Sequence, residues 1–463
     1  EILPPSTSLH EMVAEVGGQY VIIERCLLLA SMHRAYAAES NIEDPRYYRP
    51  LNIRSATGVS PGNRKALQTV LVETCFYAAR RSTQRAFCTG HTGTASGMAN
   101  FCSDALSGGF LEVLRHRAED YGVALLKPGD GLLVGSANYF STATSIIGGR
   151  QPAAGVTSAA NAKNTLEDTE RRSQKIAQAC ALLNDVQVAA YHTEQLMAML
   201  NEAIAKGFPQ NSHGTEQLLL CVKSLSSVQD QFKAAAEGSI ESLESILKPR
   251  IRSIVGESVG TENSSTFMVS PVMKQSNQSG GIGGGGAGGT STRMNYDLDE
   301  EAYNFLQLSE GYMAHLCALL QELVEPLREY LAPPLWDSLW INIVSTTAKR
   351  LETLLRKSNF SALGALAFDS DMRDFVALTR DLLLSDDYAS NTAVTKACVP
   401  LGRLAQMAKL LNIDEVEDVL DVISSLKRKG NWDWKLEDAQ TFLELRFPGD
   451  KVREVLRLQD QEL

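Results

Sequence analysis

The stretch WDSLWINIVSTTAKRLETLLRK, residues 336–357, decides the fold class. Its large apolar side chains recur every three or four residues, at Trp336, Leu339, Trp340, Ile343, Val344, Leu351, Leu354 and Leu355. That spacing places them on one face of an α-helix, whereas a strand would alternate apolar and polar residues. Segments 358–378, 402–426 and 434–447 show helical spacing or the turns between helices. The C-terminal region therefore predicts a helical bundle.

The rest of the chain shows the same spacing. It predicts helices over residues 9–38, 65–88, 101–117, 167–206, 216–247 and 296–330. Pro249 is expected to end the fifth of these, and Pro326 to bend or end the sixth. Residues 41–63 hold several prolines and predict a loop, and the strand-like run 122–126 cannot form a sheet by itself. The predicted fold class is all-α.

Composition divides the chain into five predicted segments. Residues 127–164 are rich in Gly, Ser, Ala and Thr, and residues 256–295 contain the tract GGIGGGGAGGT. Glycine loses the most backbone entropy on ordering and brings no side chain to pack. We therefore expect residues 127–164 to be a flexible insertion and residues 256–295 to be a disordered insertion. The remaining segments, 1–126, 165–255 and 296–463, are predicted to be helical bundles.

Overall composition limits the classes of partner. With 44 Lys and Arg against 55 Asp and Glu, the net charge is −11, which argues against binding nucleic acid. No apolar run approaches the ~20 residues that span a bilayer, so no direct membrane insertion is predicted. The eight cysteines include no C-x-x-C pair, which favours reduced thiols in the cytosol. Because the chain starts at Glu1, we expect its natural amino terminus to be absent.

Motifs that could indicate chemistry have simpler explanations. Residues 58–62 (GVSPG) match the G-x-S-x-G turn that exposes a nucleophilic serine, but that turn needs a strand before it and a helix after it. Here Ser60 lies in a proline-containing loop, where an ordinary turn is favoured. The glycine tract fits G-x-G-x-x-G without the βαβ unit that a dinucleotide site requires, and no histidine pair has the zinc-protease spacing. No catalytic, cofactor-binding or metal-binding residue is predicted, and a serine hydrolase using Ser60 is the remote alternative.

Four C-terminal segments together resemble a known family. In order they are SNFSALGALAFDSDMRDF (358–375), RLAQMAKLLNIDEV (403–416), a tryptophan-bearing loop, and LEDAQTFLELR (436–446). They resemble the carboxyl end of the fourth-subunit family of the conserved oligomeric Golgi complex, a vesicle tether built of helical rods. The resemblance is specific over about 336–458 and looser over 1–256, and the two insertions depart from it. It implies consecutive helical bundles that form an elongated rod with a compact C-terminal helical domain.

The resemblance also implies a function. It points to a non-catalytic scaffold subunit, without cofactors, that helps capture vesicles in retrograde transport within the Golgi. The implied location is cytoplasmic, peripheral on the cytosolic face of Golgi membranes. Implied partners are sister subunits, with SNARE and Sec1/Munc18-type fusion proteins contacted largely through an amino-terminal region that we expect to be missing here. A subunit of another helical-rod tether, or a generic helical scaffold, is the nearer alternative.

One charged pair follows from the resemblance. Arg403 lies where the family has an arginine in RLxQMA, which in the family pairs with an acidic residue at the start of a later helix. The matching residue is Asp438, where the family has Glu, and Glu437 is a rival because the alignment is uncertain by two residues. The pair would join two helices and shape a surface for partners; the alternative is an unpaired surface arginine. An exposed pair contributes only ~0–1 kcal/mol, so shape should matter more than stability.

Overall fold

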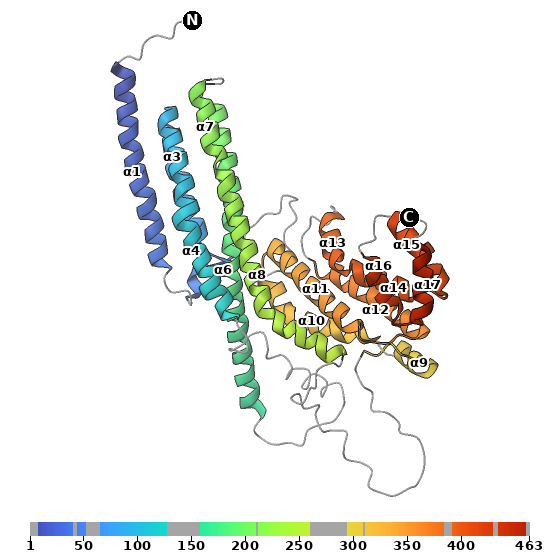
Figure 1. The fold of residues 1–463 in the computed structure, drawn as a ribbon. Coiled ribbons are helices and arrows are strands. Elements are labelled where there is room, and N and C mark those ends of the chain that lie inside the picture. Colours follow the sequence, from blue (N-terminus) through green and yellow to red (C-terminus); the bar gives the residue numbers. More distant parts are fainter. Residues whose placement is uncertain are drawn as a thin grey trace. The chain divides into compact units, whose positions relative to one another are not determined.

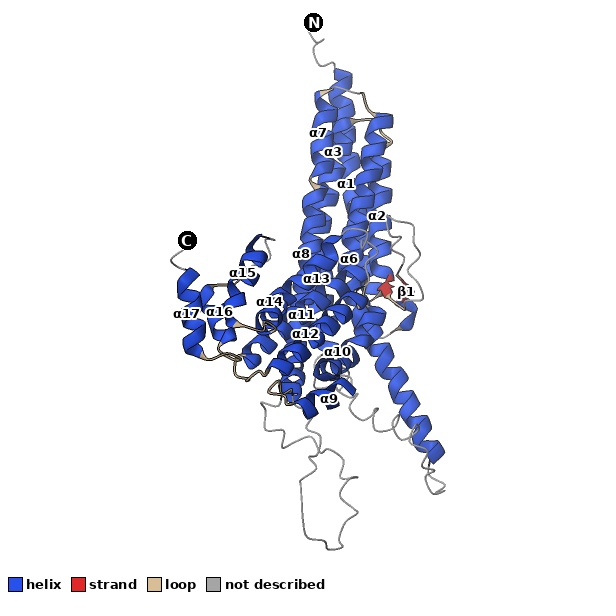
Figure 2. Ribbon diagram, turned by 90° about the vertical axis from the view of Figure 1, so that its right-hand side faces the viewer, coloured by secondary structure: helices blue, strands red, loops and turns tan. Residues whose placement is uncertain are grey.

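Helices make up most of the structure (Figure 1, Figure 2). The computed structural model describes residues 8–39, 44–51, 65–126, 158–209, 212–259, 294–308, 311–383, 391–428 and 434–459. The predicted all-α class is confirmed. Residues 127–157 and 260–293, most of the two predicted insertions, lie outside the described residues, and the five-segment division stays a prediction.

The chain forms two compact units. Unit 1 comprises Glu1–Ile246 and Leu323–Leu339, and unit 2 comprises Leu247–Glu322 and Trp340–Leu463. The boundaries that divide the chain into the two units fall within three helices: α8 (Leu225–Val259), α10 (Gly311–Tyr330) and α11 (Pro333–Leu355).

Unit 1 is a helical bundle with one short β-ribbon. Its other elements are α1 (Ser8–Ala38), a 3₁₀ turn (Pro45–Tyr47), β1 (Tyr48–Pro50), β2 (Leu67–Thr69), α2 (Val70–Phe87), α3 (Thr92–Ala105), a π-helix (Leu106–Phe110), α4 (Leu111–His116), a second π-helix (Arg117–Val123), α6 (Ser158–Gly207) and α7 (His213–Lys223). Helix α1 packs against α2 and α3, and α3 packs against α7. Both views show α1, α3 and α7 running side by side (Figure 1, Figure 2).

Aromatic rings fill the centre of unit 1. The fully buried ring of Phe110 lies 5.9 Å from Phe76 of α2, 6.1 Å from Phe232 of α8 and 6.4 Å from Tyr36 of α1, measured between centroids. Such edge-on and stacked pairs stabilise a core beyond the area that they bury. One aromatic residue thus joins three helices that are far apart in the sequence.

Helix α1 approaches α3 closely at Gly17. A β-carbon at this position would lie 2.5 Å from the hydroxyl oxygen of Thr94, in the first turn of α3. A glycine inside a helix costs about 1 kcal/mol relative to alanine. The close contact between the two helices explains why one is present here.

The β-ribbon is a feature that the sequence did not predict. Strands β1 and β2 pair antiparallel, with Tyr48 opposite Thr69 and Pro50 opposite Leu67. The helix expected from residue 65 begins only at Val70, because tertiary contacts hold residues 67–69 extended. One of these contacts is Asn184 of α6, whose side-chain amide donates to the Leu67 carbonyl at 2.9 Å. The strand-like run 122–126 is instead helical at its start, where it completes the second π-helix.

A buried charge cluster joins the ribbon to the helices of unit 1. Asp185 of α6 accepts hydrogen bonds from the Thr69 backbone N–H at 2.7 Å and from the Thr69 hydroxyl at 2.6 Å. Arg117 lies 3.5 Å from Glu39, next to the end of α1. None of these four residues is more than 8% exposed. Glu39, Thr69, Arg117 and Asp185 are called the buried cluster below.

Burial shifts the acids of this cluster toward their neutral forms. Burial raises the pKa of Glu39 to about 7, although attraction to Arg117 opposes the shift. Burial also raises the pKa of Asp185 to about 6, against the pull of Arg117 and the hydrogen bonds from Thr69. The one arginine of the cluster does not offset the desolvation of two carboxylates.

Unit 2 is a second helical bundle. Besides the ends of α8 and α11 and the start of α10, it contains α9 (Glu300–Leu308), α12 (Ala362–Asp381), α13 (Asn391–Cys398), a 3₁₀ turn (Val399–Leu401), α14 (Gly402–Leu411), a 3₁₀ turn (Val416–Asp418), α15 (Val419–Arg428), α16 (Leu436–Leu443) and α17 (Gly449–Gln459). Helix α12 packs against α9, α13 and α14, and α16 packs against α14 and α17. The deciding stretch 336–357 falls almost wholly in α11, where Trp340 is buried and donates its indole N–H to the Thr379 carbonyl at 3.0 Å.

Two prolines do not end their helices. Helix α8 continues through Pro249 to Val259, and α10 continues through Pro326 to Tyr330. A proline inside a helix costs about 3 kcal/mol. Beyond Pro249 the side chains of Ile251, Ile254 and Val255 are buried, and their packing offsets that cost.

A segment without regular secondary structure, residues 294–299, replaces the start of the helix predicted over 296–330. It crosses the amino end of α12, where Ser361 N–H donates to the Tyr296 carbonyl at 3.0 Å and Leu298 N–H donates to the Ser361 hydroxyl at 3.0 Å. A β-carbon at Gly364 would overlap the Tyr296 carbonyl. The buried Tyr296 hydroxyl donates to Asp371 at 2.8 Å. Residues 294–299 are called the strap below.

Candidate interaction site

The structure brings Arg403 and Asp438 together. Arg403 is the second residue of α14 and Asp438 lies in the first turn of α16, two helices that pack on each other. The Arg403 Nη2 atom lies 3.5 Å from Asp438 Oδ2. The rival acid, Glu437, is exposed, and no ion pair joins it to the described residues. A role for Arg403 and Asp438 in binding partners stays a prediction.

The shorter contacts of Arg403 are with a residue that sequence reasoning missed. Glu352, near the end of α11, accepts from Arg403 Nη2 at 2.9 Å and from Arg403 Nε at 3.1 Å. Arg356, just past α11, lies 2.9 Å from Glu352 and 3.0 Å from Asp438. Two arginines thus alternate with two carboxylates and join α11, α14 and α16. Glu352, Arg356, Arg403 and Asp438 are called the C-terminal cluster below.

Two aromatic rings lie beneath the arginines of this cluster. The Arg403 guanidinium carbon is 4.8 Å from the centroid of the Trp434 ring, and that of Arg356 is 4.8 Å from the Phe442 ring. The two rings are 4.3 Å apart and nearly fully buried. Cations stacked on aromatic faces are held in position as well as attracted. The cluster is therefore a fixed layer of charge on an aromatic base.

Partial exposure and matched charge keep the acids ionised. Burial alone would raise the pKa of Glu352, but hydrogen bonds from Arg403 and Arg356 outweigh it and hold that pKa below its usual value. The pKa of Asp438 is lowered in the same way, chiefly by Arg356 against the effect of burial. The four side chains are 16–34% exposed, so their ion pairs are screened by water. The arrangement can set the geometry of three helix ends and present fixed charge.

The sequence carries a weak signal for the two missed residues. Glu352 and Arg356 are spaced i, i+4, which predicts an ordinary pair on one helix surface. Nothing in that spacing indicates that Arg403 and Asp438 complete the group, because the contact depends on how α11, α14 and α16 pack.

The other predicted features fall elsewhere. Ser60, its G-x-S-x-G motif and the glycine tract lie outside the described residues. Within the described ranges, no group of three or more His, Cys, Asp and Glu side chains is placed to hold a metal ion. No helix in the described part of the chain is long and apolar enough to span a membrane.

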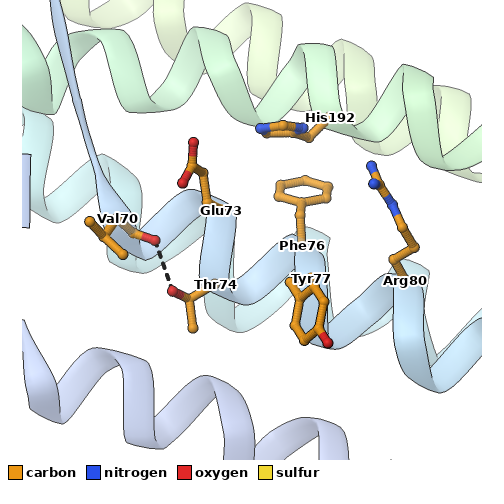
Figure 3. A pocket seen from close by; sticks show the side chains of 7 residues that line it. All are labelled: Val70, Glu73, Thr74, Phe76, Tyr77, Arg80 and His192. Atoms are coloured by element: carbon orange, nitrogen blue, oxygen red, sulfur yellow. Dashed lines mark hydrogen bonds between the residues drawn. The ribbon is translucent and has the colours of Figure 1, made fainter. Parts of the chain in front are cut away.

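An open pocket of about 400 Å³ lies between α2 and α6 in unit 1 (Figure 3). Its centre is the buried ring of Phe76, with the His192 ring 5.3 Å away, and Glu73 and Arg80 flank it. Burial lowers the pKa of His192, which favours the neutral form of its ring. The hydroxyl of Thr74 donates to the Val70 carbonyl of its own helix, so it is not activated by the histidine. The pocket therefore presents an aromatic surface between two charges and no activated nucleophile.

Comparison with known proteins agrees with the predicted resemblance. Residues 289–441 match the family model described as "Conserved oligomeric Golgi complex subunit 4, C-terminal". Over 424 residues, 90% of this chain, the sequence is 21% identical to conserved oligomeric Golgi complex subunit 4 of Mus musculus. Over 421 residues, 89% of this chain, it is 22% identical to the subunit of Drosophila melanogaster. The chain spans about half the length of these relatives, 46% and 45% respectively.

A solved structure shares the fold. The crystal structure of the C-terminal domain of the exocyst subunit Sec6p aligns with 99% of this chain and 95% of its own, with a TM-score of 0.54 and 12% sequence identity. At that identity the likeness concerns the arrangement of helices alone. The resemblance predicted from the C-terminal segments is confirmed: residues 289–441 match the subunit 4 family model, and about nine-tenths of the chain is similar, at 21–22% identity, to conserved oligomeric Golgi complex subunit 4 of two animals.

Proposed function

We propose that this protein is a non-catalytic scaffold subunit of a multisubunit tethering complex that captures vesicles in retrograde transport within the Golgi. The observation that carries the proposal is the similarity of nine-tenths of the chain to conserved oligomeric Golgi complex subunit 4. The all-α fold supports it, since packed helical bundles are rigid and present long surfaces. On this proposal the protein works in the cytoplasm, as a peripheral protein on Golgi membranes. Its partners are sister subunits, with SNARE and Sec1/Munc18-type proteins as further contacts.

We further propose that the C-terminal cluster shapes a surface that a partner contacts. Arg403 is 34% and Asp438 27% exposed, so both can touch a partner while Glu352 and the aromatic base hold them in place. The exposed ion pairs contribute little to stability. Loss of Arg403 should therefore weaken binding more than folding.

Affinity purification of the tagged full chain from cells tests both proposals. We expect the other subunits of a conserved oligomeric Golgi complex to co-purify with the wild-type chain. Arg403→Met should reduce their yield severalfold while the thermal unfolding midpoint changes little. The matched control is Arg373→Met, because Arg373 is a 75%-exposed arginine of α12 in the same unit and pairs with Asp369.

The outcomes separate the two proposals. If no sister subunit co-purifies with the wild-type chain, the tethering function is wrong. If sister subunits co-purify equally with wild type and Arg403→Met, the function stands and the role of the C-terminal cluster is wrong.

A further inference from the structure

An arginine without a partner lies in the pocket between α2 and α6. Arg80 of α2 is half-buried, yet it forms no hydrogen bond or ion pair with any described residue. Its Nε atom is buried and has no hydrogen-bond partner there. Buried polar groups are normally paired, and an arginine withdrawn from water normally faces an anion. The Arg80 guanidinium therefore suits an anion that the described residues of unit 1 do not supply.

An acid lies at the other end of the pocket. One oxygen of Glu73, Oε1, accepts a hydrogen bond from the Gln68 side chain at 2.7 Å, and the other has no partner among the described residues. Glu73 and Arg80 are seven residues apart on α2, or about two helical turns, so they lie on one side of the helix about 10 Å apart along its axis. The pocket thus has a negative end and a positive end.

Aromatic rings separate the two charges. The Phe76 ring forms the floor of the pocket, with the His192 ring 5.3 Å away and tilted by 35°. Figure 3 shows Glu73 and Arg80 on opposite sides of this pair of rings. Tyr77 also lines the pocket and is 65% exposed. An aromatic side chain of a binding partner would pack well here, because rings attract each other both edge-on and offset.

The size of the pocket limits what can enter it. Its volume of about 400 Å³ lies near the lower end of the range of ligand pockets, about 300–1,000 Å³. Such a space takes one large side chain, whereas the backbone of a partner stays outside it. An occupant that matches the pocket therefore inserts an aromatic side chain, with an acid on the Arg80 side and a base on the Glu73 side.

Spacing selects a helix as the occupant. In a helix, residues seven positions apart lie on one side about 10 Å from each other, and a residue three or four positions along lies between them. In an extended strand, residues on one side are about 7 or 13 Å apart, so neither spacing matches the separation of Glu73 and Arg80. We propose that this pocket is the docking site for a helix of a partner protein, which inserts an aromatic side chain between an acidic and a basic residue seven positions apart. The acid pairs with Arg80 and the base with Glu73.

Selection from a peptide library tests the proposal. The library is displayed on phage as an alanine-based helix and is randomised at positions i, i+3, i+4 and i+7. The purified full chain should enrich peptides with an aromatic residue at i+3 or i+4 and opposite charges at i and i+7. Selection on Arg80→Met should lose the acid and keep the aromatic residue, whereas selection on Glu73→Gln should lose the base.

The affinity of one selected peptide measures each contact. In fluorescence anisotropy, replacing its aromatic residue by alanine should weaken binding by about tenfold or more, because a side chain that fills a pocket dominates such interfaces. Arg80→Met should weaken binding by about threefold to tenfold. The matched control is Arg81→Met, because Arg81 is an exposed arginine next to Arg80 in α2 and does not line the pocket. It should change the affinity by less than about twofold, and circular dichroism should show wild-type helical content in all three variants.

Several results would overturn the proposal. These are selection of no peptide, selection of the same peptides by wild type and Arg80→Met, equal loss of affinity in Arg80→Met and Arg81→Met, and a proline-broken peptide that binds as well as the helical one. Self-association of the wild-type chain that Arg80→Met abolishes would assign the pocket to a second copy instead.

Discussion

The buried cluster of unit 1 and the C-terminal cluster of unit 2 use the same side-chain types in opposite surroundings. In the first, one arginine faces two acids that are almost fully buried, and burial raises the pKa of both carboxyls. In the second, two arginines face two acids that are partly exposed, and the arginines lower the pKa of both carboxyls. The difference shows that the ratio of charges and the access of water decide what an ion pair does. The buried cluster should govern stability, and the C-terminal cluster should govern shape.

The largest expected effect comes from Arg117→Met. This change leaves two buried carboxylates without their arginine, and breaking a buried pair costs about 3–5 kcal/mol. Urea unfolding at pH 8 measures the loss. The control, Arg115→Met, removes an exposed arginine that pairs with Glu112, and should change the unfolding free energy by less than about 0.5 kcal/mol. If the two variants lost the same unfolding free energy, the buried cluster would contribute no more to stability than an exposed ion pair does.

The next effect is a dependence on pH near neutrality. Because the pKa of Glu39 is higher in the folded protein than in the unfolded chain, the stability it contributes is full below about 4.5 and is lost as the pH rises through about 7. We expect the free energy of unfolding to be about 1–3 kcal/mol lower at pH 8 than at about pH 4.5. Glu39→Gln should flatten this slope. A variant that kept the wild-type slope, in urea unfolding at a series of pH values, would assign the dependence to other groups.

The C-terminal cluster should respond in the opposite direction and more weakly. The pKa values of Glu352 and Asp438 are lowered by folding, so their contribution is present above the unfolded values and is lost as the pH falls through the folded ones. A double-mutant cycle of Arg403→Met and Glu352→Gln should give a coupling of about 1 kcal/mol at pH 7, which disappears once the carboxylate is protonated. The matched cycle with Glu437→Gln should give none. Similar couplings at the two acids would contradict the observed pairing.

The smallest effect is expected from Asp438→Glu. The aspartate lies 3.5 Å from Arg403, and the longer side chain can approach it more closely. The coupling between residues 403 and 438 should rise by about 0.3 kcal/mol, measured with double-mutant cycles that combine Arg403→Met with removal of the carboxylate at position 438. A weaker coupling would mean that Arg356, 3.0 Å away, is the partner that sets the position of residue 438.

Much of the fold could be predicted from the sequence, because helical spacing is a local property. The stretch 336–357 shows it: its apolar face alone indicates α11. What the sequence could not predict depends on contacts between distant residues. Strand β2 has only three residues, too few for a pattern, and it is held by Asn184 and Asp185 more than a hundred positions away. The prediction that Pro249 ends its helix was wrong for the same reason, because side chains buried beyond it stabilise the continuation of α8.

Of the four residues in the C-terminal cluster, two could be predicted from the sequence and two could not. Arg403 and Asp438 could be found because the resemblance supplied a pairing between helices, and the structure places them 3.5 Å apart. Glu352 and Arg356 could not be found, because their own sequence indicates only a local pair on α11. Their closer contacts with α14 and α16 depend on the packing of three helices.

The strap also bears on how the chain folds. Leu298 and Ser361 are 63 positions apart, and Tyr296 and Asp371 are 75 apart, so these contacts close large loops. Helices form in about a microsecond. Contacts that close long loops form more slowly, because closing the loop costs more chain entropy. Helix α12 should thus exist before the strap reaches it, with the space beside Gly364 still open to water. On a ribosome, where residues 294–299 emerge well before α12, the strap would be synthesised first and docked last.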